Sequence, residues 1–399
     1  MTVDSAADAL MPTYNRADLA FERGEGAYLQ NWDGTWYLDF ASGIAVTALG
    51  HGHPHLVAAL TDQAQKVWHT SNLFRIPEGE RLARRLCAAS FAESVFFCNS
   101  GVEAIEAAVK MARKYHDDTG NPHRWRVIAC HDAFHGRTLT GIAASGSDKY
   151  RKGFEPTMPG FDHVAYDNMN QVRQAITDET AAILVEPVQG EGGIRPADLQ
   201  YLAALRQVAD EYGLLLIFDE IQCGMGRTGR LFAHEWAGVA PDIMPLAKGI
   251  GGGFPMGAVL TTQAVADVMG PGSHGTTFGG NPLAMAVGNA VLDVMLAEGF
   301  LDGVDTVARD LWAQLRDLAA RYPDVIAEVR GAGLMLGLKC AVANADMVAA
   351  LRGEHMLSVP AGDNVVRLLP PLIIGHDEAA EAVRRIERAC VHLGGEASQ

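Results

Sequence analysis

The segment Leu214-Leu215-Leu216-Ile217-Phe218-Asp219-Glu220 decides the fold class of this 399-residue chain. Its apolar residues show no alternation of polar and apolar positions, which predicts a strand buried on both faces in the middle of a mainly parallel sheet. Ligands of such sheets bind beyond the carboxyl ends of the strands. The carboxylate of Asp219 therefore stands where chemistry is expected, and its burial calls for a cationic partner.

A second candidate for chemistry is Lys248, which lies between apolar residues 243–247 and glycine-rich residues 249–255. Loss of solvation disfavours the ammonium form of such a lysine and makes it an amine nucleophile. Pyridoxal phosphate (PLP) requires an acid that keeps its pyridine nitrogen protonated and a lysine that holds its aldehyde as a Schiff base. The alternative is that Asp219 is an acid at the edge of the core and Lys248 a surface residue, with no shared role.

Composition limits the class of protein. The net charge of −16 does not suit non-specific nucleic-acid binding, and 48% hydrophobic residues suffice for a large core. The six cysteines are scattered without a C-x-x-C pair, which is typical of reduced thiols in the cytoplasm. We recognise no signal peptide and no apolar run of membrane-spanning length. We therefore expect a cytoplasmic protein that binds neither nucleic acid nor membrane.

Predicted strands alternate with helices between residues 51 and 295. We expect strands at residues 94–98, 127–130, 182–185 and 214–218, and helices at residues 54–67, 99–115, 197–212 and 281–296. This order predicts an α/β fold in which helices cover both faces of a mainly parallel sheet. Residues 51–295 are therefore expected to form a large, cofactor-binding domain.

The character of the chain changes after residue 296. A helix at residues 304–322, strands at 325–329, 334–338 and 365–369, and helices at 345–351 and 378–393 predict a smaller α+β domain over residues 296–399. Near the N-terminus, Asp33-Gly34 between two short apolar segments predicts a hairpin. Residues 1–50 are expected to contribute to the small domain.

Several loops after predicted strands carry polar or aromatic residues. Asn99-Ser100-Gly101 opens a helix, where free N–H groups and the helix dipole favour a phosphate, although an ordinary N-cap explains the same residues. Phe134 can stack on a planar ring, and Arg137 can bind a carboxylate with two parallel hydrogen bonds. An acid-ended strand precedes the glycine-rich residues 186–193, and residues 274–282 place hydroxyls among glycines.

Two other patterns invite different functions. His51, His53 and His55 alternate as metal ligands can, but they lie on a Gly/Pro loop at a helix start, so we expect no metal site. Residues 224–229 match the dinucleotide fingerprint G-x-G-x-x-G. No apolar helix follows them, as that fingerprint requires, so we do not expect nicotinamide binding.

Seven stretches in this order resemble the class III, or omega, aminotransferases over nearly the whole chain, most closely the branch that acts on acetylornithine. They are ASGIAVTALGHGHP, NSGVEA, FHGRT, VEPVQGEGG, FDEIQCGMGRTG, AKGIGGGFPMGA and HGTTFGGNP. The resemblance implies PLP fold type I, with a mainly parallel seven-stranded sheet plus a smaller α+β domain, and a homodimer with active sites at the interface. It also implies pyridoxal 5'-phosphate as cofactor and no metal.

The resemblance assigns cofactor-binding roles to Ser100, Gly101, Val102, Phe134, Asp219, Gln222, Lys248 and Thr277. Lys248 is expected to hold the cofactor aldehyde and to move the proton between the substrate and the cofactor. Asp219 is expected to pair with the pyridine nitrogen, Gln222 to contact the ring hydroxyl and Phe134 to stack on the ring. The phosphate is expected to lie on residues 100–102, joined by Thr277 of the other subunit. Threonine is common in this branch where the chain has Val102.

The substrate-binding residues implied by the resemblance are Arg137, Thr276, Glu191 and Arg367. Arg137 is expected to bind a substrate carboxylate, and Thr276 to touch the acylated substrate across the interface. Glu191 and Arg367 resemble a switch pair, in which the arginine binds the α-carboxylate of glutamate or 2-oxoglutarate. Glu191 neutralises Arg367 when a terminal amine is the donor.

The reaction implied by the resemblance is PLP-dependent transamination of N-acetylornithine with 2-oxoglutarate. Its products are N-acetylglutamate 5-semialdehyde and glutamate, as in arginine biosynthesis. The sequence leaves open another omega-aminotransferase, acting on succinyldiaminopimelate, ornithine or 4-aminobutyrate. It also leaves open a PLP aminomutase or racemase on the same fold.

Overall fold

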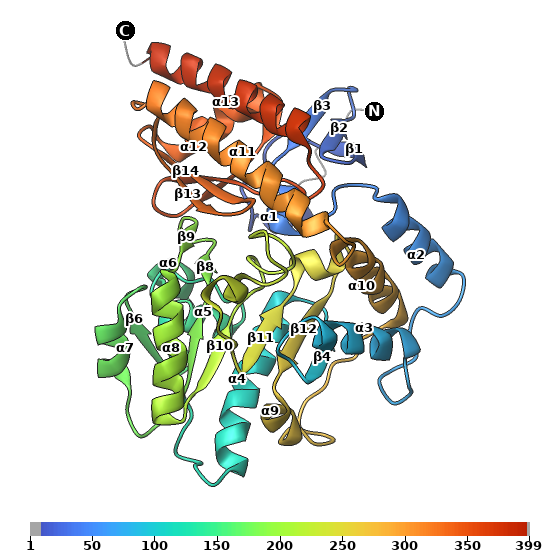
Figure 1. Ribbon diagram of the computed structural model, residues 1–399, viewed down its shortest axis with the longest axis vertical. Helices are drawn as coiled ribbons and strands as arrows, with labels where there is room; N and C mark the ends of the chain where they lie inside the picture. The colour runs from blue at the N-terminus through green and yellow to red at the C-terminus, as the bar shows by residue number, and fades with distance from the viewer. Residues whose placement is uncertain (1–8, 397–399) are drawn as a thin grey trace.

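The computed structural model describes residues 9–396 and is built around a seven-stranded sheet (Figure 1). In spatial order its strands are β4 (Ser94–Cys98), β12 (Gly257–Thr261), β11 (Ile243–Leu246), β10 (Leu215–Phe218), β7 (Thr180–Val185), β5 (Arg126–Cys130) and β6 (Phe161–Val164). Every neighbouring pair is parallel except the two that involve β12. The mainly parallel sheet is therefore confirmed.

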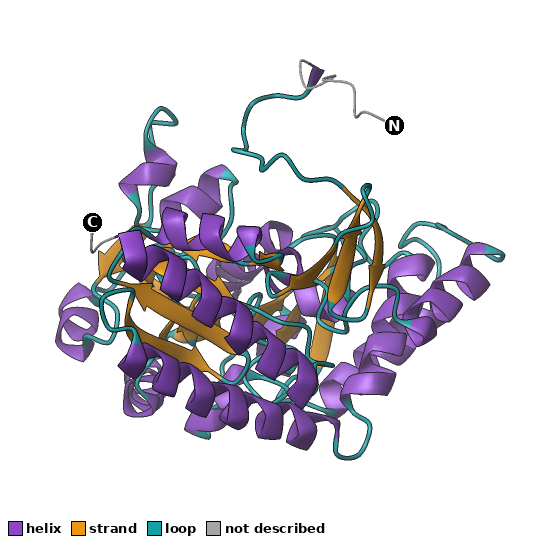
Figure 2. Ribbon diagram, turned by 90° about the horizontal axis from the view of Figure 1, so that it is seen from above, coloured by secondary structure: helices purple, strands orange, loops and turns teal. Residues whose placement is uncertain are grey.

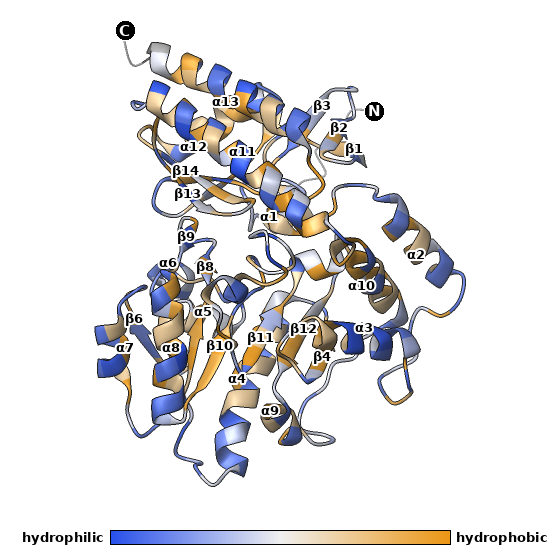
Figure 3. Ribbon diagram, in the orientation of Figure 1, coloured by the Kyte–Doolittle hydropathy of each residue, from blue (hydrophilic) through white to orange (hydrophobic). Residues whose placement is uncertain are grey.

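Strand β10 is buried on both faces, as its sequence predicted. Leu215 and Ile217 pack into the cluster formed with helix α4 (Gly101–Asp118). Leu216 and Phe218 pack into the opposite cluster, formed with α8 (Leu199–Tyr212). Successive residues of a strand point to opposite faces, so a strand between two helical layers must be apolar throughout. The hydropathy of β10 and β11 shows the same continuous apolar character (Figure 3).

Helices surround the strands when the molecule is seen from above (Figure 2). Those of the first three hundred residues are α1 (Ser42–Ala45), α2 (Pro54–Ala64), α3 (Pro77–Ala88), α4, α5 (Leu139–Ala144), α6 (Asp148–Arg151), α7 (Met169–Ala175), α8, α9 (Gln263–Asp267) and α10 (Pro282–Met295). Two 3₁₀ helices, η2 (Ala233–Ala237) and η3 (Lys248–Gly251), follow β10 and β11. Helix α10 is buried along most of its length.

The N-terminal hairpin and the C-terminal part together form two more four-stranded sheets, with three helices. One sheet has the order β13 (Ile326–Ala332), β14 (Met335–Cys340), β17 (Val365–Leu368) and β16 (Val359–Ala361). Helices α11 (Phe300–Arg321), α12 (Asn344–Gly353) and α13 (His376–Glu396) accompany it. The other sheet has the order β1 (Phe21–Glu25), β2 (Tyr28–Asn31), β3 (Trp36–Asp39) and β15 (Met356–Leu357), and a two-stranded ribbon joins β8 (Val188–Gln189) to β9 (Arg195–Pro196). Strand β3 pairs with β15 in parallel, so the N-terminal hairpin is attached to the C-terminal part.

Most predicted elements are present, with shifted ends. Helix α2 stops at Ala64, three residues before the apolar pattern suggested. Strand β13 continues through the predicted turn to Ala332, and Gly333 has a positive φ of 54°. A side chain there would collide with the backbone of Thr228, so the tight turn depends on glycine.

Within residues 9–396, no single helix is long and apolar enough to span a bilayer. Helices α10 and α11 together have the length and composition of a membrane-spanning segment, but they are bent by 68° relative to each other.

Candidate active site

The carboxyl ends of the central strands meet at a cavity of about 430 Å³. Most of the predicted cofactor and substrate residues line it, namely Ser100, Gly101, Val102, Phe134, Arg137, Asp219, Gln222 and Lys248. They come from loops after four different strands and from the start of α4. The doubly covered sheet therefore brings together residues that are up to 148 positions apart, from Ser100 to Lys248.

Lys248 begins η3 directly after β11 and has a positive φ of 51°. A residue with a Cβ is strained in this region, and such strain is typical of functional positions. Burial first, and the nearby charge of Arg367 second, lower the pKa of the Lys248 amine to about 8. An appreciable fraction of the amine is therefore neutral near physiological pH and able to act as a nucleophile.

Asp219 directly follows β10 and is 3% exposed. Its Oδ2 lies 2.8 Å from Nδ1 of His135, and its Oδ1 accepts a hydrogen bond from the backbone N–H of Ile221. Burial lowers the pKa of His135, but the hydrogen bond and charge of Asp219 outweigh burial, so the net pKa is raised. The cationic partner expected for Asp219 is therefore His135, which the sequence analysis did not predict as a site residue. The only signal in the sequence that could have identified His135 is its position next to Phe134.

A second buried carboxylate, Glu186, also faces the cavity and was not predicted as a site residue. Its side chain accepts hydrogen bonds from the backbone N–H groups of Phe134 and Gly190. Burial raises the pKa of the Glu186 carboxyl to about 7, although the nearby His135 opposes the rise. Glu186 therefore anchors both loops that flank the cavity.

The N-terminus of α4 points into the cavity. The Ser100 side chain caps the helix by accepting from the N–H of Glu103. Among the described residues, no backbone hydrogen bond engages the N–H groups of Gly101 and Val102, so both are free for an anion. A side chain on Gly136 would collide with Val102, so these two loops touch closely. The predicted phosphate position has the donors it needs.

Arg367 lies beside this cavity and is 1% exposed. Its Nη1 is 2.7 Å from Oε1 of Glu191 and donates to Oε1 of Gln222 at 3.3 Å. The structure therefore brings together the two members of the predicted switch pair. Glu191 lines a second, polar cavity of about 510 Å³.

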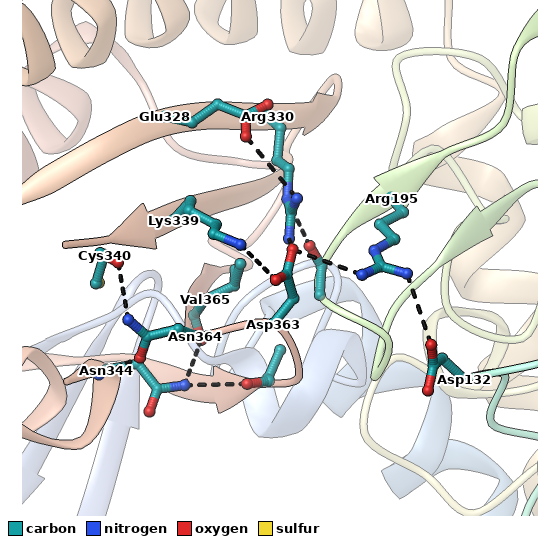
Figure 4. A network of polar contacts seen from close by, with 12 residues as sticks. Asp132, Arg195, Glu328, Arg330, Lys339, Cys340, Asn344, Asp363, Asn364 and Val365 are labelled. Atoms are coloured by element: carbon teal, nitrogen blue, oxygen red, sulfur yellow. Dashed lines mark hydrogen bonds and ion pairs between the residues drawn. The ribbon is translucent and has the colours of Figure 1, made fainter. Parts of the chain in front are cut away.

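An ionic network ties the Glu191 loop to the sheet that carries Arg367 (Figure 4). Asp363 is its centre: it pairs with Lys339 and with Arg330 at 2.6 Å, and Arg195 lies 3.6 Å away. The hydrogen bond from Lys339 lowers the pKa of Asp363 to about 2, and Arg330 contributes to the lowering. The Gly362 N–H donates to the carbonyl of Glu191 at 2.8 Å. The backbone of Glu191 is thus held in place, which leaves its side chain as the part that can move.

Thr276 and Thr277 do not reach the cavity of their own chain. Oγ1 of Thr276 accepts from Asn99, which does line the cavity. Thr277 and the neighbouring Phe278 are exposed. Within one chain, the structure therefore places these two predicted residues apart from the others.

Neither the histidines of residues 51–55 nor residues 224–229 are among the residues that line this cavity. His51 and His55 hydrogen-bond to Asp39 and Asp293, respectively, on different elements. No group of three His, Cys, Asp or Glu side chains in residues 9–396 is arranged to hold a metal ion. Residues 224–229 lie in a series of turns that leads only to the short η2, without the helix that a dinucleotide requires.

The donor set fits pyridoxal phosphate. The cavity holds a lysine amine of lowered pKa, a buried carboxylate, an aromatic ring and a helix N-terminus with free N–H groups. These are the groups that an aldehyde, a pyridine nitrogen, a planar ring and a phosphate need, respectively. Lys248, Asp219, Phe134 and Ser100 all line this one cavity.

Comparisons with known proteins all find similarity to aminotransferases. The family model described as "Aminotransferase class-III" matches residues 11–390. The acetylornithine aminotransferase of Mesorhizobium japonicum is 61% identical over 378 residues, which is 95% of each chain. The ornithine aminotransferase of Toxoplasma gondii superposes with a TM-score of 0.94 at 34% identity, covering 98% of this chain and 94% of the other. The N-acetylornithine aminotransferase of Stenotrophomonas maltophilia superposes with a TM-score of 0.84 at 38% identity, covering 96% and 98%.

Proposed function

The chain belongs to the class III aminotransferases, and on this premise we propose that it transfers the terminal amine of N-acetylornithine to 2-oxoglutarate, as in arginine biosynthesis. The products are N-acetylglutamate 5-semialdehyde and glutamate. The observation that carries the proposal is the buried Arg367 paired with Glu191 at 2.7 Å. A reversible ion pair of this kind suits an enzyme that takes two different substrates in turn at one site.

Pyridoxal phosphate, when bound, supplies an aldehyde for the exchange of amino groups and a ring that accepts electrons. In our proposal, Lys248 holds the aldehyde and Asp219 keeps the pyridine nitrogen protonated. His135 orients the Asp219 carboxylate through its 2.8 Å contact. Phe134 would cover one face of the ring, and Gln222 would contact the ring hydroxyl.

The phosphate is assigned to the N-terminus of α4. Ser100 would supply a hydroxyl, and the N–H groups of Gly101 and Val102, which make no backbone hydrogen bond, would donate to the phosphate. Val102 has no hydroxyl to add.

In the first half of the reaction, the amine-bearing carbon of N-acetylornithine approaches Lys248, and Arg137 binds the α-carboxylate. Glu191 neutralises Arg367 during this step, so no buried cation is left unpaired. Once the donor amine has replaced it at the aldehyde, the freed Lys248 amine would remove a proton from the amine-bearing carbon, as its lowered pKa allows. In the second half, Glu191 swings aside and Arg367 takes the α-carboxylate of 2-oxoglutarate, while Arg137 holds the other carboxylate.

We also propose a homodimer with active sites at the interface. The exposed position of Thr277 in a single chain supports this arrangement, because its hydroxyl is then available to the phosphate of the other subunit. Thr276 would touch the acylated substrate across the same interface. Cytoplasmic location is proposed from the six cysteines, all of them free in the structure.

The proposed division of the chain keeps residues 51–295 as the large domain and residues 296–399 as the small one, with residues 1–50 attached to the latter. Pairing of β3 with β15 supports the attachment.

Ornithine is the second candidate donor, because the structure superposes on an ornithine aminotransferase with a TM-score of 0.94. Fold similarity does not discriminate between donors that differ in one acyl group. The 61% identity with an acetylornithine aminotransferase favours the acylated substrate. Succinyldiaminopimelate and 4-aminobutyrate remain donors of the same reaction class, and an aminomutase or racemase would need no keto acid.

The test is a set of single half-reactions of the PLP-loaded enzyme with N-acetylornithine, ornithine, succinyldiaminopimelate and 4-aminobutyrate. Loss of the cofactor's visible absorption is expected to be fastest with N-acetylornithine, and 2-oxoglutarate is expected to restore it. Faster bleaching with another donor would overturn the substrate assignment. Product formation without any keto acid would overturn transamination in favour of an isomerase.

A further inference from the structure

Arg137 lines the active-site cavity, and its guanidinium carbon lies 5.7 Å from the centre of the Phe134 ring. Its side chain is exposed, and no carboxylate in residues 9–396 lies within ion-pairing distance of its guanidinium. A free arginine side chain samples many rotamers, and binding a carboxylate costs the entropy of fixing one of them. Some other contact must hold Arg137 if it is to bind substrate efficiently.

Tyr150 supplies that contact. The guanidinium carbon of Arg137 lies 4.4 Å from the centre of the Tyr150 ring, which is within the range of a cation–π interaction. The Tyr150 ring is itself held edge-on against Phe134, with centroids 5.5 Å apart and an interplanar angle of 75°. Tyr150 belongs to α6 and is half-buried, so it links the cofactor-stacking ring to the substrate-binding arginine.

An aromatic partner suits this position better than an acid. A carboxylate next to Arg137 would neutralise it and compete with the carboxylate of the substrate. A ring attracts the flat face of the guanidinium and leaves the N–H groups at its edge free to donate two parallel hydrogen bonds. Lys149 also approaches the same ring, with its ammonium 5.7 Å from the centre, and makes no ion pair among the described residues.

We propose that Tyr150 is a positioning residue that holds Arg137 for the carboxylate of the substrate. By holding Arg137, Tyr150 makes the site favour amines and keto acids that present a carboxylate to Arg137. This inference rests on the proposed function, in which N-acetylornithine and 2-oxoglutarate both present a carboxylate to Arg137. It extends that function by naming Tyr150 as a residue that makes the site selective for substrates with a carboxylate.

The test compares Tyr150→Leu, which removes the ring, with Tyr150→Phe, which keeps it. Each PLP-loaded enzyme reacts with N-acetylornithine and with N-acetyl-1,4-diaminobutane, which differs only by lacking the carboxylate. Loss of a cation–π contact predicts that Tyr150→Leu lowers kcat/KM for N-acetylornithine about 3- to 30-fold, through KM rather than kcat. The value for N-acetyl-1,4-diaminobutane should stay within about twofold. Tyr150→Phe should behave as the wild type with both amines.

Equilibrium binding gives a readout that does not depend on turnover. Glutarate carries two carboxylates but cannot be transaminated, and its dissociation constant should rise by the same factor in Tyr150→Leu. In a background of Arg137→Gln, Tyr150→Leu should weaken glutarate no further.

Equal losses with both amines would overturn the inference, because the ring would then serve only the fold. A loss in Tyr150→Phe as large as that in Tyr150→Leu would overturn it too, since the hydroxyl would be the active group. If the wild type does not use N-acetylornithine, the proposed function fails by itself. The same comparison with ornithine and 1,4-diaminobutane then decides the role of Tyr150.

Discussion

Replacing Lys248 by methionine should stabilise the cofactor-free protein. Methionine has a similar length and carries no charge, so the exchange removes a buried ammonium while keeping the volume filled. Both residues have a Cβ, so the strain of the positive φ at position 248 is the same in the two proteins. The difference in stability therefore reports the electrostatic cost of the lysine.

The magnitude follows from the Lys248 pKa. Lowering this pKa from 10.5 to about 8 corresponds to an upper limit of about 3 kcal/mol in unfolding free energy. Below pH 8 the amine is protonated in both states, so the full cost of the buried charge is present. As pH rises from 8 to 10.5, the folded protein carries the neutral amine while the unfolded chain still binds a proton, and the cost disappears.

The assay is thermal unfolding of both cofactor-free proteins at pH 7 and at pH 10. For a chain of 399 residues, unfolding entropy scales to a shift of about 1.2 °C per kcal/mol, so Lys248→Met should unfold about 2–4 °C higher at pH 7. The gap should narrow to about 1 °C at pH 10. Lys66→Met, at an exposed lysine paired with Asp62, is the matched control and should gain nothing at either pH. A gap that is absent at pH 7, or equal at both pH values, would refute the reasoning.

Three further predictions concern Glu191, Val102 and Asp363. Glu191→Ala removes the carboxylate that pairs with Arg367, so KM for 2-oxoglutarate should fall about 3- to 10-fold, while the half-reaction with N-acetylornithine should slow about tenfold. Stopped-flow measurement of each half-reaction checks this prediction, and equal slowing of both half-reactions would contradict it. Val102→Thr adds a hydroxyl at the phosphate position and should lower the dissociation constant of PLP about 3- to 10-fold in a fluorescence titration; an unchanged constant would place residue 102 away from the phosphate. The pKa of Asp363 is lowered to about 2, first by Lys339, so the stability it adds is complete above pH 4 and lost as pH falls towards 2. In an acid-unfolding series, Asp363→Asn should therefore be less stable than the wild type at pH 6, and the difference in unfolding free energy should shrink below pH 4. A difference that does not depend on pH would count against the ionic network.

The sequence was most informative where a pattern repeats over a whole element. The unbroken apolar run of β10 predicted burial on both faces because each face meets a helix, and Asp219 followed from the end of that run. Strand, N-cap and helix at Ser100 were predicted from local chemistry alone. Such features depend on neighbours in the chain, which the sequence displays directly.

Other features depend on partners far away in the chain. The antiparallel direction of β12 leaves no mark in its own residues. Glu191 and Arg367 are 176 positions apart, and only the family resemblance suggested that they meet. The roles of His135 and Tyr150 arise from contacts with Asp219 and Arg137 that no spacing rule predicts.

The pairing of β3 with β15 sets a condition on how the protein is made. It joins Leu38 to Met356, so the N-terminal hairpin gains its last neighbour only after more than three hundred further residues have been synthesised. At ordinary translation speeds that interval is about 15–60 s. The nascent hairpin spends it with an open edge beside the ribosome, which makes this edge the natural place for a chaperone to act during synthesis.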